Sequence, residues 1–155
     1  MIRLSFASRL EAPAAEVWAH ASSMGGVNAE LMPFMRMSVP SHVVDLDIGQ
    51  APVGRTAFAS WMLAFGFLPV DRHFLGFEQI LPGKGFDERS YSWMQKRWIH
   101  RRRVEPDGDG SRITDELEFE PRLPGAGLLL EPIVRNLFEH RHRRLRARFG
   151  AVEHH

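Results

Sequence analysis

Two residues on one short segment, Asp71 and His73, have the types and the spacing needed for acid–base chemistry. Side chains two apart on a strand face the same way, so the carboxylate could orient an imidazole that takes up or releases a proton. The same pattern also fits a structural histidine that is simply held by a hydrogen bond. The sequence leaves both interpretations open and makes Asp71 and His73 candidate catalytic residues.

A second carboxylate, Asp115, is predicted to point inward. In the segment 112–121, alternate positions separate an acidic face from a mostly apolar one that includes Asp115. Because glutamates mark the solvent side of a strand, Asp115 should lie on the buried side. It could pair there with an inward arginine, or it could remain solvated at the mouth of the sheet.

Arg141 is the corresponding cation on a predicted C-terminal helix. At about 100° per residue, Leu130, Val134, Leu137 and Leu145 fall in one sector of the helical wheel, and Arg141 lies inside that sector. The guanidinium could pair with a core carboxylate such as Asp115, reach the surface along a packed stem, or contact a ligand. The other arginines of the basic stretch 138–150 mostly face solvent.

A third histidine, His100, depends on an ambiguous segment. Aromatic residues occupy both parities of 93–103, so its inner face cannot be assigned. If the side that carries Trp98 is inner, His100 joins the interior as a third acid–base candidate, and Arg101 and Arg103 lie outside.

No metal or cofactor site is predicted. The chain has no cysteine, which excludes disulfides and thiolate ligands. His140 and His142 are two apart on a helix, so they should face different directions and cannot chelate one metal together. Glycine-rich nucleotide motifs and the His-Glu-x-x-His zinc motif are absent.

The elements that must position these residues follow an α+β order. A strand ends near Pro13, two short helices occupy about 13–23 and 24–33, strands and turns fill 34–121, and a helix spans about 128–149. Strands are expected within 34–40, 42–47, 54–65, 70–81, 88–105 and 112–121. Tight turns between long strands predict an antiparallel sheet that buries one face against the last helix.

Bulk composition sets further limits. The 155 residues predict one domain over 1–150, and the tail 151–155 resembles the start of a purification tag. A formal net charge of +1 argues against a DNA-binding domain. The apolar run 61–70 is too short to cross a bilayer, so a cytoplasmic protein is expected.

The segment "SRLEAPAAEVWAHAS", the order of elements and the closing "LLEPIVRNLFEHRHRRLRARF" resemble the START/Bet v1-like helix-grip superfamily, which includes polyketide cyclase-like domains. The resemblance implies a seven-stranded antiparallel sheet curved around the long helix, two short helices after the first strand, and an apolar cavity between sheet and helix. The superfamily offers no invariant catalytic motif to carry over.

The main functional hypothesis is therefore a cavity that binds a hydrophobic or amphipathic small molecule. Two alternatives stay open: a cyclase- or dehydrase-type enzyme that uses inward His and Asp residues, and a module that docks on a membrane, RNA or ribosome through its basic surface. The candidate ligand-binding residues are Trp61, His73, Phe77, Trp98, Asp115, Leu137 and Arg141.

Overall fold

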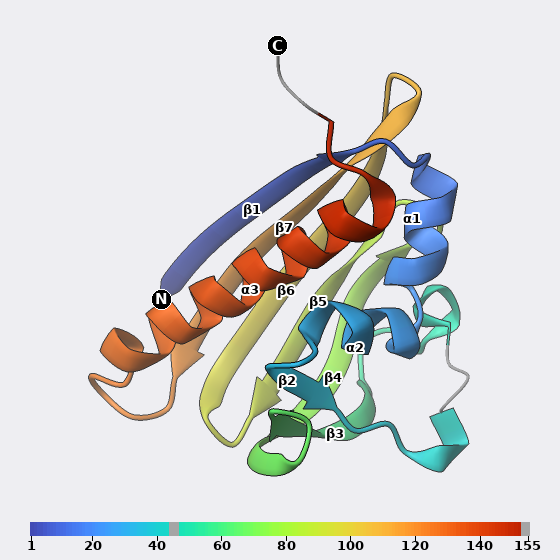
Figure 1. Ribbon diagram of the computed structural model, residues 1–155. Coiled ribbons are helices and arrows are strands. Elements are labelled where there is room, and N and C mark those ends of the chain that lie inside the picture. The colour runs from blue at the N-terminus through green and yellow to red at the C-terminus, as the bar shows by residue number, and fades with distance from the viewer. Residues whose placement is uncertain (44–46, 153–155) are drawn as a thin grey trace.

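The computed structural model describes residues 1–43 and 47–152, and its strands form one seven-stranded antiparallel sheet (Figure 1). The order across the sheet is β1-β7-β6-β5-β4-β3-β2. The strands are β1 (Ile2–Leu10), β2 (Met35–Met37), β3 (Thr56–Ala64), β4 (Leu68–Leu81), β5 (Gly85–Ser92), β6 (Gln95–Asp107) and β7 (Gly110–Pro121). The helices are α1 (Ala14–Ala21), α2 (Met24–Leu31) and α3 (Gly127–Phe149), with 3₁₀ turns at Ser41–Val43 and Ile48–Gln50. The predicted α+β helix-grip fold is confirmed.

The long helix α3 crosses the concave face of the sheet, and α1 and α2 cover the part of that face that α3 leaves (Figure 1). Register shifts in the β3–β4 and β4–β5 pairs introduce irregularities that help a sheet to bend. Apolar residues of α3 explain the position of the helix. Val134 and Phe138 pack on Leu117 and Phe119 of β7, and Leu145 packs farther along on Ile113.

The end of α3 is tied to the end of β1. Gly150 follows the helix with φ 83°, a conformation that favours glycine. A Cβ there would also lie 2.5 Å from the Glu11 carboxylate. The backbone N–H of Glu11 donates to the Gly150 carbonyl at 2.8 Å, which fixes the helix across the sheet.

Two strand predictions are corrected. Residues 42 and 43 of the segment 42–47 form no strand but belong to the 3₁₀ turn Ser41–Val43, and 44–46 lie outside the described residues. The segment 88–105 is two strands, because the chain turns at Trp93 and Met94, where the Ser92 hydroxyl accepts a hydrogen bond from the Gln95 N–H at 2.9 Å. This turn contains neither glycine nor proline, so composition gave no signal for it.

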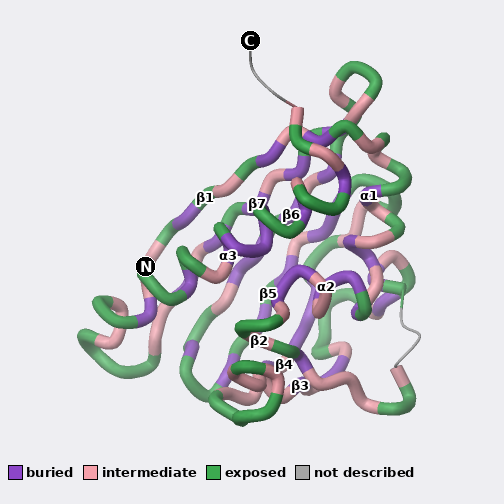
Figure 2. Tube along the Cα trace, viewed as in Figure 1, coloured by how far each residue is buried: buried purple, intermediate pink, exposed green. Residues whose placement is uncertain are grey.

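Buried residues alternate with less buried ones along β7 and recur along α3 (Figure 2). They form three apolar clusters: one under α2, one under the first half of α3 and one under its second half. No described helix is both long enough and apolar enough to cross a bilayer.

Candidate functional site

A cavity of about 440 Å³ lies between the sheet, α2 and α3. Its walls are mainly apolar and come from elements far apart in sequence. Apolar lining residues include Val27, Met37, Met62, Leu75, Phe77, Phe86, Trp98, Leu130, Leu137 and Phe138. Volume and lining are those of a small-molecule site.

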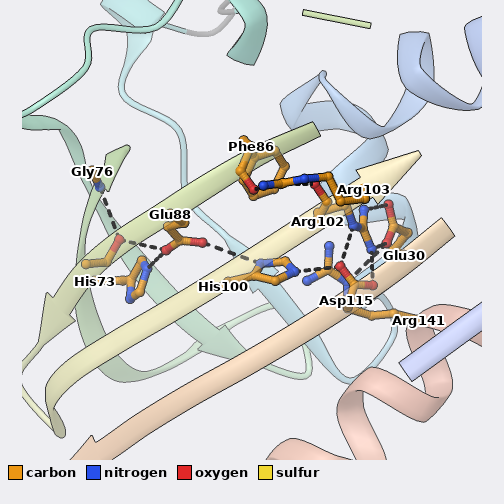
Figure 3. Close-up of polar contacts among 11 residues, drawn as sticks. Glu30, His73, Gly76, Phe86, Glu88, His100, Arg102, Arg103, Asp115 and Arg141 are labelled. Carbon is orange, nitrogen blue, oxygen red and sulfur yellow. Dashed lines mark hydrogen bonds and ion pairs between the residues drawn. The ribbon is translucent and has the colours of Figure 1, made fainter. Parts of the chain in front are cut away.

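The polar groups that line this cavity come mostly from the inner faces of β4, β5 and β6. They are Asp71, His73, Glu88, Ser92, Gln95, His100 and Arg141. Several of them begin a continuous buried polar network that runs from β4 to α2 (Figure 3).

The first part of the network joins His73 to Glu88. The His73 Nε2 lies 2.7 Å from Glu88 Oε2, and both side chains are buried. The Ser90 hydroxyl donates to the same oxygen at 2.7 Å and accepts the Gly76 N–H. A carboxylate only accepts, so the His73 Nε2 carries the proton and the ring is oriented by Glu88.

His100 continues the network from Glu88 to Asp115. Its Nδ1 is 3.6 Å from Glu88 Oε1, and its Nε2 is 2.6 Å from Asp115 Oδ1. The ring packs edge-on against Phe86 and Phe138, which restricts its orientation.

Arg102 forms the centre of the network and is fully buried. Its Nε and Nη2 donate to the two oxygens of Asp115 at 2.7 and 3.0 Å. Its Nη1 and Nη2 donate to the two oxygens of Glu30 at 3.0 and 2.7 Å. Two-point contacts of this kind are the strongest that a guanidinium makes.

Arg141 reaches the same cluster from α3. Its Nε donates to Glu30 Oε1 at 3.1 Å, and its guanidinium lies 4.7 Å from the centre of the Phe138 ring. Arg141 therefore pairs with Glu30 of α2, and it lines the cavity as well.

His142 closes the network on the side of β1. Its Nε2 lies 2.7 Å from Asp115 Oδ2, and its Nδ1 lies 2.8 Å from the Ser8 hydroxyl. Asp115 thus receives hydrogen bonds from three side chains at once: His100, Arg102 and His142.

The three carboxylates stay ionised despite their burial. Burial raises the pKa of Asp115, but Arg102 and His100 outweigh it and hold the pKa well below its ordinary value. Burial likewise opposes ionisation of Glu30, yet Arg102 and Arg141 lower its pKa. The pKa of Glu88 is also lowered, because the hydrogen bonds of His100 and His73 exceed the effect of burial.

The two arginines respond in opposite directions. Burial lowers the pKa of Arg141, and the carboxylates of Glu30 and Asp115 do not fully compensate. Burial also disfavours the charge on Arg102, but Asp115 and Glu30 together raise its pKa. Arg102 is thus the fixed cation of the network, and Arg141 is the more weakly compensated one.

Comparison with known proteins agrees with this architecture. The family model described as "Domain of unknown function (DUF8410)" matches residues 8–149. The chain belongs to this family. A comparison with curated proteins finds no match.

Solved structures place this DUF8410 domain in the START/Bet v1-like fold. Protein CV1439 from Chromobacterium violaceum is similar with a TM-score of 0.69 at 16% identity, over 97% of this chain and 99% of that one. A START superfamily protein from Mycobacterium smegmatis has a TM-score of 0.63 at 12% identity, with 95% and 96% covered. Ara h 8.0201 has a TM-score of 0.56 at 10% identity, with 92% and 95% covered. These identities show the fold alone.

Most of the predicted site residues of the DUF8410 domain meet at the cavity. Its lining includes Asp71, His73, Phe77, Trp98, His100, Leu137 and Arg141. Asp115 is inward, as its parity predicts, but it lies behind the wall and reaches the cavity through His100. The side that carries Trp98 is the inner face of β6.

Three expectations for this DUF8410 domain are corrected. Trp61 is not part of the cavity lining: it is half-buried, packs edge-on against Trp93, and Arg72 lies 4.6 Å from its ring centre, whereas its neighbour Met62 faces inward. Asp71 does not orient His73; its carboxylate accepts the backbone N–H groups of Arg72 and Met94.

The third correction concerns pairing. Arg141 bonds Glu30, whereas the guanidinium on Asp115 is that of Arg102. On the outer face of the sheet, Arg103 pairs with Asp87 at 2.7 Å and Arg3 pairs with Glu118 at 3.4 Å.

Sequence reasoning missed Glu30, Glu88 and Arg102. Trp98, His100 and Arg102 alternate along β6 and therefore point to the same side of the sheet. If the inner face of 93–103 had been assignable from the sequence, Arg102 would have been predicted to point inward. Glu88 would have followed from recognising the turn at Trp93. Glu30 sits on a short helix with weak periodicity, and no local signal marks it as buried.

Proposed function

We propose that this domain binds a hydrophobic or amphipathic small molecule in the 440 Å³ cavity. The observation that carries the proposal is that the cavity lining is mainly apolar and includes only a few polar side chains. Met, Leu, Val and Phe side chains supply most of the surface, whereas the polar groups come from His73, Gln95, His100 and a few neighbours. Apolar walls give affinity, and a few fixed polar groups select orientation.

Gln95 supports a ligand with a polar end. Its Oε1 is the one side-chain oxygen or nitrogen among the described residues that is fully buried without a hydrogen-bond partner. Gln95 stands beside Ser92 and Met94 in the cavity lining. A small rotation of the amide would present an acceptor to a ligand hydroxyl or N–H.

The binding proposal is tested with a neutral fluorescent probe, N-phenyl-1-naphthylamine, on protein purified without detergent. Leu75 is buried in β4 and lines the cavity, so Leu75→Trp should fill it and weaken probe binding by at least about tenfold, a loss of ~1.4 kcal/mol. Val53→Trp is the matched control, because Val53 is exposed and outside the lining.

Native mass spectrometry of the same preparation would identify a co-purified compound. The proposal fails if the wild-type protein binds neither the probe nor any apolar compound, or if Leu75→Trp binds the probe as well as the control does.

A second candidate function is proton transfer to or from the bound molecule. The observation that favours it is the 2.7 Å His73–Glu88 pair on the cavity wall, which leaves the His73 Nδ1 as an acceptor. If a compound is identified, its conversion by wild-type protein should be lost in His73→Gln while binding persists. Equal conversion by both proteins would exclude His73 as the base.

A further inference from the structure

Large apolar side chains are exposed mainly at one end of the molecule. Because neighbouring strands are antiparallel, the start of β1, the end of β7, the β5–β6 turn, the β3–β4 turn and the start of β2 meet at the same end of the sheet. The start of α3 follows directly from β7 and lies there too (Figure 1, lower left). We call this region, residues 1–4, 34–37, 61–72, 91–98 and 119–135, the apolar end.

With one exception, the exposed large apolar residues of the described chain lie within this apolar end. They are Met1, Phe34, Phe65, Phe67, Leu68, Val70, Tyr91, Trp93, Met94, Leu123, Leu128, Leu129 and Ile133. Val53 is the one other exposed large apolar residue in the described part of the chain. Phe67 is 73% exposed and Leu128 is 89% exposed, so neither is covered by the protein itself.

The opposite end of the sheet has a different character. Its turns contain Pro82, Gly83 and Lys84 between β4 and β5, and Gly108 and Asp109 between β6 and β7; the β6–β7 turn is the loop at the top of Figure 1. Such residues are what hairpin turns in water require. The turns at the apolar end carry aromatic and leucine side chains instead, and turn geometry does not explain those.

The cavity opens at the apolar end. Val70, Met94, Leu129 and Ile133 line the cavity, yet each is at least 40% exposed. Residues that line the cavity and are also exposed to solvent mark its opening. The exposed apolar side chains therefore surround the entrance of the site described above.

The charge of the apolar end selects its partner. The end carries seven basic side chains and three acidic ones, and Glu118, which pairs with Arg3, lies at its border, so an excess of three positive charges remains. The basic residues are Arg3, Arg36, Arg72, Lys96, Arg97, Arg122 and Arg135, and the acidic ones are Asp71, Glu120 and Glu131. Six of the seven basic residues are exposed, whereas all three acidic residues are half-buried.

This charge excess favours a lipid surface over a second copy of the chain. Two positive ends of the same kind repel each other, whereas aromatic side chains surrounded by arginine suit the interface of an anionic bilayer.

We propose that the apolar end docks on an anionic lipid bilayer with the cavity mouth facing it. Phe67 and Leu128 enter the interface and the arginines contact lipid phosphates, so that an apolar ligand passes between bilayer and cavity. The docking proposal is supported by the exposed apolar and charged residues of the apolar end and does not depend on ligand binding. Only the passage of ligand rests on the proposed function.

Vesicle co-sedimentation of the full chain tests this proposal. Wild-type protein should sediment with phosphatidylcholine vesicles that contain phosphatidylglycerol, much less with pure phosphatidylcholine, and less at high salt. The double variant Phe67→Ser/Leu128→Ser should lose about tenfold or more of its vesicle affinity, and Arg97→Glu should weaken it as well. Val53→Ser, which removes an exposed apolar residue elsewhere, should bind as wild type does.

A second readout separates docking from ligand binding. Neither Phe67 nor Leu128 lines the cavity, so the double variant should bind N-phenyl-1-naphthylamine with unchanged affinity. The proposal is overturned if wild-type protein fails to sediment with anionic vesicles at low salt, or if the double variant sediments equally. A concentration-dependent dimer that the double variant abolishes, without vesicle binding, would overturn it in favour of a second copy. If wild-type protein binds the vesicles but does not bind the probe, the ligand-binding function is rejected and the docking proposal stands.

Discussion

Arg102 and Asp115 form a two-point ion pair, and they are direct partners in the register of β6 and β7. Partners across two antiparallel strands face the same side of the sheet, so both side chains point at the core. The pair is fully buried, and it draws His100, His142 and Glu30 around it.

Neutralising Asp115 should strongly destabilise the fold. Asp115→Asn keeps the shape of the side chain but leaves the buried Arg102 with a single anionic partner, Glu30. Removing one partner of a buried pair costs about 3 kcal/mol or more. Urea unfolding should show this loss, whereas Glu118→Gln on the outer face of β7 should change the free energy of unfolding by less than about 1 kcal/mol. Equal effects of the two variants would mean that the pair contributes no more than a surface contact.

Stability should decrease as the solution becomes acidic. The folded-state pKa values of Asp115, Glu30 and Glu88 lie below their ordinary values, so the unfolded chain binds protons more readily. Their contribution is fully present above about pH 5 and is lost as the pH falls through and below the ordinary carboxyl range near pH 4. Urea unfolding at a series of pH values measures this slope, which should be shallower in Asp115→Asn. A free energy of unfolding that stays constant from pH 6 to pH 3 would contradict the assignment.

The fold was predictable from the sequence because its signals are local. Alternation in 112–121 placed Asp115 inward, and the helical wheel placed Arg141 inward. Their partners depend on tertiary structure. Arg102 lies in a run of three arginines whose inner face was ambiguous, and Glu30 is buried only because α2 rests over Arg102 and Arg141. Local patterns give the direction of a side chain, and the three-dimensional arrangement decides which charge it meets.

Gln95 should tolerate an apolar replacement. Its buried Oε1 has no partner, so Gln95→Met, which is similar in shape, removes the cost of an unmade hydrogen bond. The melting temperature should stay equal or rise, with a gain of up to about 1 kcal/mol. Gln79→Met on the exposed part of β4 serves as the control and should change little. A loss of more than about 1 kcal/mol in Gln95→Met would show that the amide has a partner in solution, such as a bound water.

His142 should be held in a single tautomer. Asp115 is an ionised acceptor, so the His142 Nε2 at 2.7 Å must carry the proton. Arg146 donates to the Ser8 hydroxyl oxygen at 2.9 Å, which leaves the hydroxyl hydrogen for His142 Nδ1 at 2.8 Å. Long-range ¹H–¹⁵N correlation spectra at neutral pH should therefore show the Nε2–H form of this ring.

Two variants separate the contacts that set this tautomer. Ser8→Ala removes the Nδ1 partner but keeps Asp115, so the Nε2–H form should persist. Asp115→Asn replaces the ionised acceptor with an amide that can donate as well as accept, so His142 should show a mixture of tautomers. A neutral ring protonated at Nδ1 and not at Nε2 in the wild-type protein would mean that His142 does not donate to Asp115, and that the carboxylate is held by His100 and Arg102 without it.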